Sequence, residues 1–332
     1  MANLQQPYFQ SVQWSTSTAY AVLGAMKAVA TLNGDRPLDQ ISHEMLVAVQ
    51  DWVFQTKIEV ENLSILSPIE LAEEVQDQRQ RQQALQFIIL MPYLDTQVDK
   101  EEVKLVDDFA VALDLAPQTL KSLRLVRDRK FKQLLFGFTW RAFSDLGLEG
   151  FWSKIKFLWS GLHQYMGDKR VAKRYQALSA LPSGTLGREL FNYYRNNNIP
   201  VPGEKKSLSE ALVGHDLVHL LSGIGTDMKG EINVGGFEAG MSRSEFGFEL
   251  LLEVVLDFHL GLEFSTVGII EPDCNHLNPN ALMEAYSRGL QMQFDLLDPD
   301  WDYRAVFNQS INELRQQYGI REQRSLSVAN SV

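Results

Sequence analysis

Two histidines and an aspartate in one short stretch have the residue types and spacing of a metal site. His215, Asp216 and His219 lie within about one helical turn, and at about 100° per residue their side chains share one arc of a helix. Two imidazoles one turn apart form a bidentate clamp for a divalent cation. Imidazole and carboxylate ligands suit zinc, iron or manganese, whereas magnesium prefers oxygen ligands and water. The sequence therefore predicts a divalent metal, zinc first, with iron, manganese and magnesium as alternatives.

A single helix rarely closes a metal site, so a further ligand should come from another segment. Glu231 is the candidate, because it follows a glycine-containing connection, 223–230, in which the chain can reverse direction. The next residues, 232–234, predict a short extended run. Glu238 is the candidate carboxylate for orienting a ligating histidine through its second ring nitrogen.

The helix that carries the histidines has boundary signals of its own. Ser207 and Glu210 are spaced as a capping box, which predicts where the helix begins, and Gly223 predicts where it ends. The shared helix face of the two histidines, the boundary signals of their helix and the expected return of Glu231 all point to the same site. Together they favour a metal site over histidines with a purely structural role. The structural interpretation applies instead to the other four histidines: His43, His163, His259 and His276.

The elements that must position this site are predicted to be helices. Apolar residues recur at three- and four-residue spacing over 44–56, 70–94, 101–113 and 117–129, and few runs alternate as strands do. The fold class is therefore expected to be all-α, with a smaller helical domain before the helical C-terminal domain that carries the two histidines. The expected divisions are an N-terminal extension (1–39), a helical domain (40–145), a basic aromatic connecting helix (146–177), the metal-site domain (178–321) and a frayed tail (322–332).

Composition limits the classes of function that the protein can have and the cellular compartment in which we expect it. The net charge of −11 argues against a dedicated nucleic-acid binder, whose phosphate contacts need a basic surface. One cysteine, Cys274, forms no intramolecular disulfide and fits a reducing compartment. The first 22 residues show no leader pattern, and the most apolar later stretch, 246–264, is interrupted by charges. We expect a cytoplasmic protein, with peripheral contact to the inner face of a membrane as an option.

The exception to the acidic balance is the segment 121–174. It contains 13 Lys and Arg against 4 Asp and Glu, together with several aromatic residues. Basic and aromatic residues together are typical of a helix that lies on an anionic membrane surface. The alternative is that the aromatic residues form a core that joins two domains while the basic side chains stay in water. The tryptophans concerned are Trp140, Trp152 and Trp159.

The metal-site motif resembles the signature of a ubiquinone (coenzyme Q) biosynthesis protein family, the family numbered four. The pattern is His-Asp-x-x-His at 215–219, then eleven residues, then Glu231. Segments 181–189 and 230–239 are similar to the flanks of that signature, and 311–320 resembles the family's closing helix. The likeness covers about residues 178–321, and residues 1–177 have no counterpart in the plain family member.

The resemblance implies an all-helical domain with a groove for a prenyl lipid beside the metal. It implies His215, Asp216, His219 and Glu231 as the metal ligands, and polyprenylated aromatic precursors of a quinone as substrates. Family members are associated with oxidative removal of the ring carboxyl group, and with scaffolding other quinone-biosynthesis proteins. The chain departs from the family at Gly235-Gly236, where bulkier residues are expected.

Two further features bear on the lipid. Arg188 is a candidate for binding the substrate head group, since arginine makes bidentate contacts to anions; an ordinary salt bridge is the alternative. The apolar faces of 246–262 and 282–297 are candidates for a lipid tunnel, and the alternative is that they are plain core.

A second, weaker resemblance concerns about residues 40–145, which are similar to tellurite-resistance B-like helical domains. It rests on the acidic turn that begins at Leu94. In that family such a turn can hold a cation, which here implies Asp95 and Asp99 as ligands. The alternative is that Asp99 only caps the helix that follows it.

Three functions remain open from the sequence. The first is a metal-dependent oxidative decarboxylase or hydroxylase of a prenylated quinone precursor. The second is a non-catalytic prenyl-lipid-binding scaffold, in which the metal holds the fold. The third is a metal phosphohydrolase, which needs further His and Asp ligands that the motif does not supply. A homodimer is also expected, from apolar helices that a lipid-handling protein exposes.

Overall fold

The computed structural model describes residues 12–95, 97–145, 167–207, 210–242, 244–262 and 274–322. Within these ranges the fold is all α, as predicted, and strand-like pairing is limited to two isolated bridges, Thr185 with Ser310 and Leu260 with Cys274. None of the helices in these ranges is long and apolar enough to cross a membrane. The predictions for 146–166 and for almost all of the tail fall outside the described residues.

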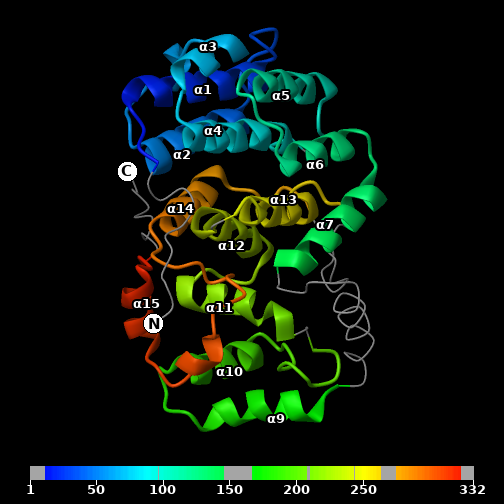
Figure 1. The fold of residues 1–332 in the computed structure, drawn as a ribbon, viewed down its shortest axis with the longest axis vertical. Helices are drawn as coiled ribbons and strands as arrows, with labels where there is room; N and C mark the ends of the chain where they lie inside the picture. Colours follow the sequence, from blue (N-terminus) through cyan, green and yellow to red (C-terminus); the bar gives the residue numbers. More distant parts are fainter. Residues whose placement is uncertain are drawn as a thin grey trace, which may run out of the picture.

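The N-terminal helices α1 to α6 form the upper part of the molecule, and α7 runs down beside the middle layer (Figure 1). Several of them begin where a side chain satisfies the free backbone N–H groups of the first turn: Ser15 caps α1, Asp77 caps α4 and Asp99 caps α5. The helices are α1 (Thr16–Thr31), α2 (Gln40–Val49), α3 (Pro68–Glu74), α4 (Gln78–Leu90), α5 (Lys100–Ala112), α6 (Gln118–Arg127) and α7 (Phe131–Asp145), with a π-helical turn at Gln50–Phe54.

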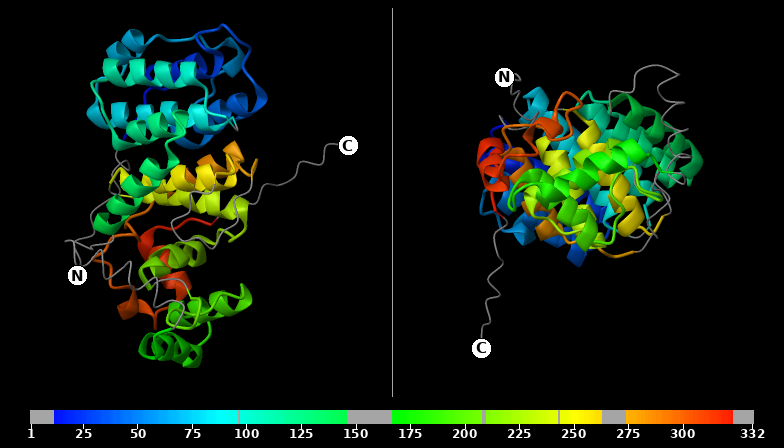
Figure 2. Two further views of the ribbon diagram at one scale, coloured as in Figure 1. Left: turned by 90° about the vertical axis from the view of Figure 1, so that its right-hand side faces the viewer. Right: turned by 90° about the horizontal axis from the view of Figure 1, so that it is seen from below.

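The remaining helices stack below this bundle along the long axis of the molecule (Figures 1 and 2). A middle layer contains α12 (Met228–Met241), α13 (Phe246–Phe258) and α14 (Pro279–Leu290). The lower part contains α9 (Lys169–Ala177), α10 (Leu186–Asn196), α11 (Val213–Ser222) and α15 (Ile311–Tyr318).

The middle helix α12 contributes to both of the hydrophobic cores. Its Ile232 and Ala239 belong to the upper core, which the N-terminal helices fill, whereas Val234 and Phe237 belong to the lower core. A helix with buried residues all round its circumference lies inside the protein rather than on its surface. Helix α12, which carries the predicted ligand Glu231, is thus anchored in a layer that the N-terminal half also covers.

Glycines allow α12 and α14 to lie close together. A Cβ atom at Gly240 would collide with the backbone oxygen of Tyr286, and one at Gly289 would collide with that of Phe237. Gly236 faces Leu282 in the same way. The Gly235-Gly236 pair, where the chain departs from its suggested family, therefore lies in a tightly packed layer.

The upper bundle and the middle layer are joined by apolar packing and by hydrogen bonds. Trp52 Nε1 donates to Asn280 Oδ1 at 2.8 Å, and Gln83 Nε2 lies 2.9 Å from the Tyr286 hydroxyl. Helix α1, inside the segment expected to be an N-terminal extension, is buried along most of its length. The division into domains stays a prediction.

The structure differs from the sequence prediction over 70–94, and it shows that the apolar faces proposed for a lipid tunnel are part of the core. The single helix expected over 70–94 is two helices, α3 and α4, because the chain becomes extended at Val75 and restarts at the Asp77 cap. The apolar faces of α13 and α14 are core: Leu251, Val255 and Leu282 are fully buried in the upper cluster.

Candidate metal centre

The helix that carries the two histidines ends as predicted but begins differently. Gly223 ends α11 in the left-handed conformation, with φ of 74°. The predicted capping box of Ser207 and Glu210 is wrong, because Ser207 Oγ instead accepts a hydrogen bond from the Gly203 N–H. Helix α11 begins only after a short 3-10 turn at Glu210–Leu212. Glu210 pairs with Arg174 and Arg304. The Glu210 carboxylate therefore binds these two arginines instead of the backbone N–H that it was predicted to cap.

The returning carboxylate comes from a helix, not from an extended run. Asp227 caps α12 by accepting from the Gly230 N–H at 2.7 Å, so the predicted extended conformation of 232–234 is wrong. The cap starts the helix early enough to include Glu231 in its first turn. Glu238 follows two turns later on the same face.

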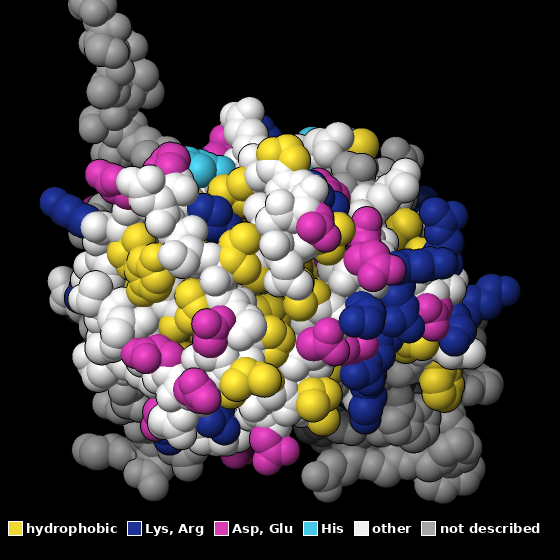
Figure 3. Space-filling model, turned by 90° about the horizontal axis from the view of Figure 1, so that it is seen from above, with side chains coloured by type: hydrophobic (Ala, Val, Ile, Leu, Met, Phe, Trp, Pro, Cys, Tyr) yellow, Lys and Arg dark blue, Asp and Glu magenta, His cyan; other side chains and the backbone are white. Residues whose placement is uncertain are grey.

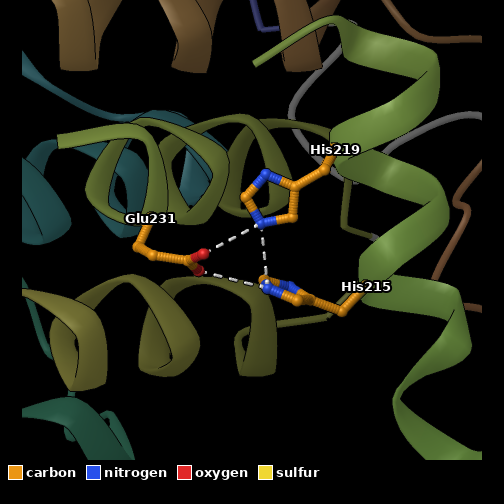
Figure 4. Close-up of side chains that lie close together, drawn as sticks. All are labelled: His215, His219 and Glu231. Carbon is orange, nitrogen blue, oxygen red and sulfur yellow. Dashed lines mark hydrogen bonds and ion pairs between the residues drawn. The ribbon is translucent and has the colours of Figure 1, made fainter. Parts of the chain in front are cut away.

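Three of the predicted ligands converge between α11 and α12 (Figure 4). His215 Nε2 lies 3.2 Å from His219 Nε2 and 3.3 Å from Glu231 Oε2. His219 Nε2 lies 3.4 Å from Glu231 Oε1. Among the parts of the chain that the structure describes, this is the group of His, Cys and acidic residues whose atoms lie close enough to hold a metal ion.

The contacts of the two Nδ1 atoms determine which ring nitrogen of each histidine carries a proton. His215 Nδ1 lies 2.7 Å from Glu238 Oε1, and His219 Nδ1 lies 3.2 Å from the Ile224 carbonyl oxygen. A carbonyl oxygen and a carboxylate accept hydrogen bonds, so each Nδ1 carries the proton. In the neutral imidazoles both Nε2 lone pairs then face the Glu231 carboxylate, so three acceptors meet, and either a cation or a proton on Nε2 must lie between them.

This donor set fits a tetrahedral metal ion. A zinc ion bound at about 2.0–2.1 Å holds neighbouring ligand atoms about 3.3–3.4 Å apart, and the three separations here are 3.2, 3.3 and 3.4 Å. Three protein ligands leave a fourth position open, as in catalytic rather than structural zinc sites. The His215 side chain is 32% exposed while that of His219 is 1% exposed, so the site opens to solvent on the His215 side.

Electrostatics favour a cation at the same place. Burial opposes a charged His215, but the Glu238 and Glu231 carboxylates outweigh burial and raise the pKa of His215 well above its ordinary value. Burial also acts against ionised Glu231, yet hydrogen bonds from the two histidines lower the pKa of Glu231 to about 2. The carboxylate is therefore ionised at neutral pH and available as a ligand.

Asp216, the fourth ligand that the resemblance implies, is not part of the converging group. Its side chain is buried and its Oδ2 accepts a hydrogen bond from the Tyr194 hydroxyl at 2.6 Å. Burial raises the pKa of Asp216 above its ordinary value. The neighbouring Tyr193 ring stacks on His219, with ring centres 6.4 Å apart. The structure thus assigns Asp216 a partner on α10.

Two arginines hold the C-terminal end of α11. Arg315 donates from Nε to the Leu221 carbonyl at 2.9 Å, and Arg288 donates from Nη2 to the Ser222 carbonyl at 2.5 Å. Cations suit the C-terminal end of a helix, where backbone carbonyls lack partners. The sequence gives no signal for these contacts or for the Ile224 carbonyl, because their partners are distant in the chain or lie in the backbone.

The other candidate residues take part in local structure. Arg188 on α10 contacts the Ser179 carbonyl oxygen. Asp99 caps α5, with the Glu101 N–H at 2.7 Å, and lies 4.0 Å from Arg36. Burial, with the Asp39 carboxylate next, raises the pKa of Asp95. None of the three belongs to the converging group.

Comparisons with known proteins add no relative: no protein-family model matches the chain, and no curated protein matches it in sequence. The family assignment from the motif stays a prediction.

Proposed function

We propose that the protein is a metal-dependent protein that binds one divalent ion, zinc first, through His215, His219 and Glu231. The observation that carries this proposal is the convergence of two imidazole Nε2 atoms and an ionised carboxylate at 3.2–3.4 Å. Three acceptors brought together inside a protein are costly unless a cation or protons compensate them. A cation satisfies all three at once.

The substrate class of the proposal rests on the sequence motif. Its resemblance to the ubiquinone biosynthesis family suggests a polyprenylated aromatic acid as substrate. The suggested reaction replaces the ring carboxyl group by a hydroxyl group and releases CO₂, with O₂ as the oxidant. The bound metal would supply a Lewis acid for an anionic oxygen ligand. The exposed His215 side of the centre would admit the aromatic head group, while buried His219 and the Tyr193 ring exclude water from the other side.

The protein's own residues position the centre. Glu238 and the Ile224 carbonyl hold the two imidazoles in the tautomer that presents Nε2. Arg288 and Arg315 hold the end of α11. These contacts give the ligands a fixed orientation before any ion binds.

Metal analysis of the natively purified full-length chain tests the proposal. Plasma mass spectrometry should find about one metal per chain in the wild type, and the double variant His215→Ala/His219→Ala should lose it. The matched control His43→Ala/His276→Ala removes two histidines elsewhere and should keep the metal. Glu238→Gln should weaken the affinity by about 10–100-fold. A wild type that takes up no zinc, iron, manganese or magnesium ends the proposal.

A second measurement separates the enzyme from a scaffold. The metal-loaded protein is incubated with a carboxylated prenyl-phenol, and product and bound lipid are followed by extraction and mass spectrometry. Turnover that disappears in the His215→Ala/His219→Ala variant supports the enzyme. Bound prenyl lipid without turnover supports the scaffold, and hydrolysis of an aryl phosphate instead supports the phosphohydrolase.

A further inference from the structure

A second surface of interest lies outside the metal centre, on α6 and α7. Between residues 118 and 138 the chain has six Lys and Arg and one Asp, although the whole protein carries −11. In the view from above, Lys and Arg side chains gather on the side of the molecule where α6 and α7 lie (Figures 1 and 3). The surface is therefore locally positive on an acidic protein.

Part of this charge is neutralised by ion pairs. Arg124 pairs with Asp107 at 2.8 Å, and Asp128 pairs with both Arg127 and Lys130. The exposed cations Lys121, Arg129 and Lys132 have no ion-pair partner within the described ranges. Three cations thus remain available to a partner.

An exposed aromatic residue accompanies these cations. Phe136 lies one turn after Lys132 on α7, so the two side chains share a face, and Phe136 is 70% exposed. The next aromatic residue along the helix, Phe138, is 4% exposed and stacks on Phe246 of α13. Packing of Phe138 against α13 therefore fixes the orientation of α7, and this orientation presents Phe136 outward.

We propose that this α6–α7 surface, formed by Lys121, Arg129, Lys132 and Phe136, docks on an anionic lipid bilayer. Phosphate and carboxylate groups of lipids attract the cations, and the phenyl ring enters the interface between head groups and acyl chains. A planar bilayer touches one side of the molecule and leaves the acidic remainder in water. A long nucleic acid is disfavoured, because the net charge of −11 repels a polyanion that extends beyond this surface.

The proposal goes beyond the metal-dependent function and does not depend on it, since α6 and α7 contribute no ligand to the metal centre. It divides the predicted basic aromatic segment between two roles: Phe138 is core, and Phe136 with its neighbouring cations is surface. The tryptophans of that segment lie outside the residues whose side chains the structure describes.

Vesicle flotation with the full-length protein tests the proposal. Phosphatidylglycerol-containing vesicles should bind the protein, pure phosphatidylcholine vesicles should not, and high salt should weaken binding because it screens exposed charges. The variant Lys121→Gln/Arg129→Gln/Lys132→Gln should weaken binding by about 100-fold, at about fivefold for each charge lost. Phe136→Ser should also weaken it.

A matched control distinguishes a specific surface from a change in net charge. Lys169→Gln/Arg170→Gln/Lys173→Gln removes three exposed cations from α9 and should leave vesicle binding unchanged. All variants replace exposed side chains, so their thermal unfolding should match that of the wild type. Equal losses in the two triple variants, or no binding to phosphatidylglycerol vesicles, would overturn the proposal. So would tighter binding to a single-stranded oligonucleotide than to the vesicles.

Discussion

At the scale of single residues, the candidate centre is determined by the groups behind its ligands. His215 is held by Glu238 on one ring nitrogen and faces Glu231 with the other. Asp216, adjacent to it in sequence, is turned away to the Tyr194 hydroxyl. Two neighbours in one motif therefore have different tasks, because successive residues of a helix point in directions about 100° apart.

The Tyr194–Asp216 contact can be tested by its effect on stability. Tyr194→Phe leaves a buried acceptor without its donor, so the free energy of unfolding should fall by about 1–3 kcal/mol. Urea denaturation of the two proteins measures this difference. Tyr175→Phe is the matched control and should cost less, because its partner Glu210 is partly exposed and keeps Arg174 and Arg304. Equal losses in the two variants would contradict the interpretation.

At the scale of elements, the centre depends on how closely α12 lies against its neighbours. Gly240 and Gly289 allow the backbones of α12 and α14 to approach, and α12 in turn presents Glu231 and Glu238 to α11. Glycine has low intrinsic preference for a helix interior. Packing, rather than propensity, therefore stabilises α12.

Replacement of Gly240 tests this packing. Gly240→Ala places a methyl group against the Tyr286 backbone oxygen, and we expect a loss of about 1–3 kcal/mol in the free energy of unfolding. Gly214→Ala is the control, since a Cβ there meets its nearest atom, Leu296 O, at 3.7 Å. Alanine at this second helical position should be neutral or stabilising by up to about 1 kcal/mol. If Gly240→Ala is as stable as Gly214→Ala in thermal unfolding, the close approach does not constrain α12.

At the scale of the whole molecule, the N-terminal bundle and the middle layer meet around His259. Its Nε2 donates to the Leu94 carbonyl oxygen at 2.6 Å, and its Nδ1 is buried with no hydrogen-bond partner in the described structure. Burial lowers the pKa of His259 below its ordinary value, while the Leu94 contact and Asp95 act in the opposite direction and His276 adds to the lowering. His259 is therefore neutral in the folded protein at neutral pH.

This lowered pKa predicts acid sensitivity. Below the ordinary histidine pKa of about 6.5, the unfolded chain binds a proton at His259 before the folded protein does, so stability falls as the pH falls. His259→Gln keeps a donor for Leu94 and cannot be protonated, so its free energy of unfolding should depend less on pH between neutral and mildly acid conditions. Denaturation at several pH values measures the two slopes, with His43→Gln as the exposed control. Identical slopes for wild type and His259→Gln would exclude this role.

The sequence by itself determined the features that depend on neighbouring residues. Helix periodicity predicted an all-α fold, Gly223 predicted the end of α11, and Asp99 was offered as the cap of α5. The spacing of His215 and His219 required that they share a helix face, and the glycine-containing connection suggested the return of Glu231. Such features are predictable because their physical causes, backbone hydrogen bonds and helix geometry, act within one or two turns.

Only the tertiary structure decided what each side chain contacts. Glu210 pairs with Arg174 and Arg304 instead of forming the predicted capping box. Asp216 accepts a hydrogen bond from the Tyr194 hydroxyl and does not join the converging ligands. The helical state of 232–234 follows from the Asp227 cap and from burial between two cores. In each case the competing partner lies in another element, and its approach depends on packing energies that the local sequence does not contain.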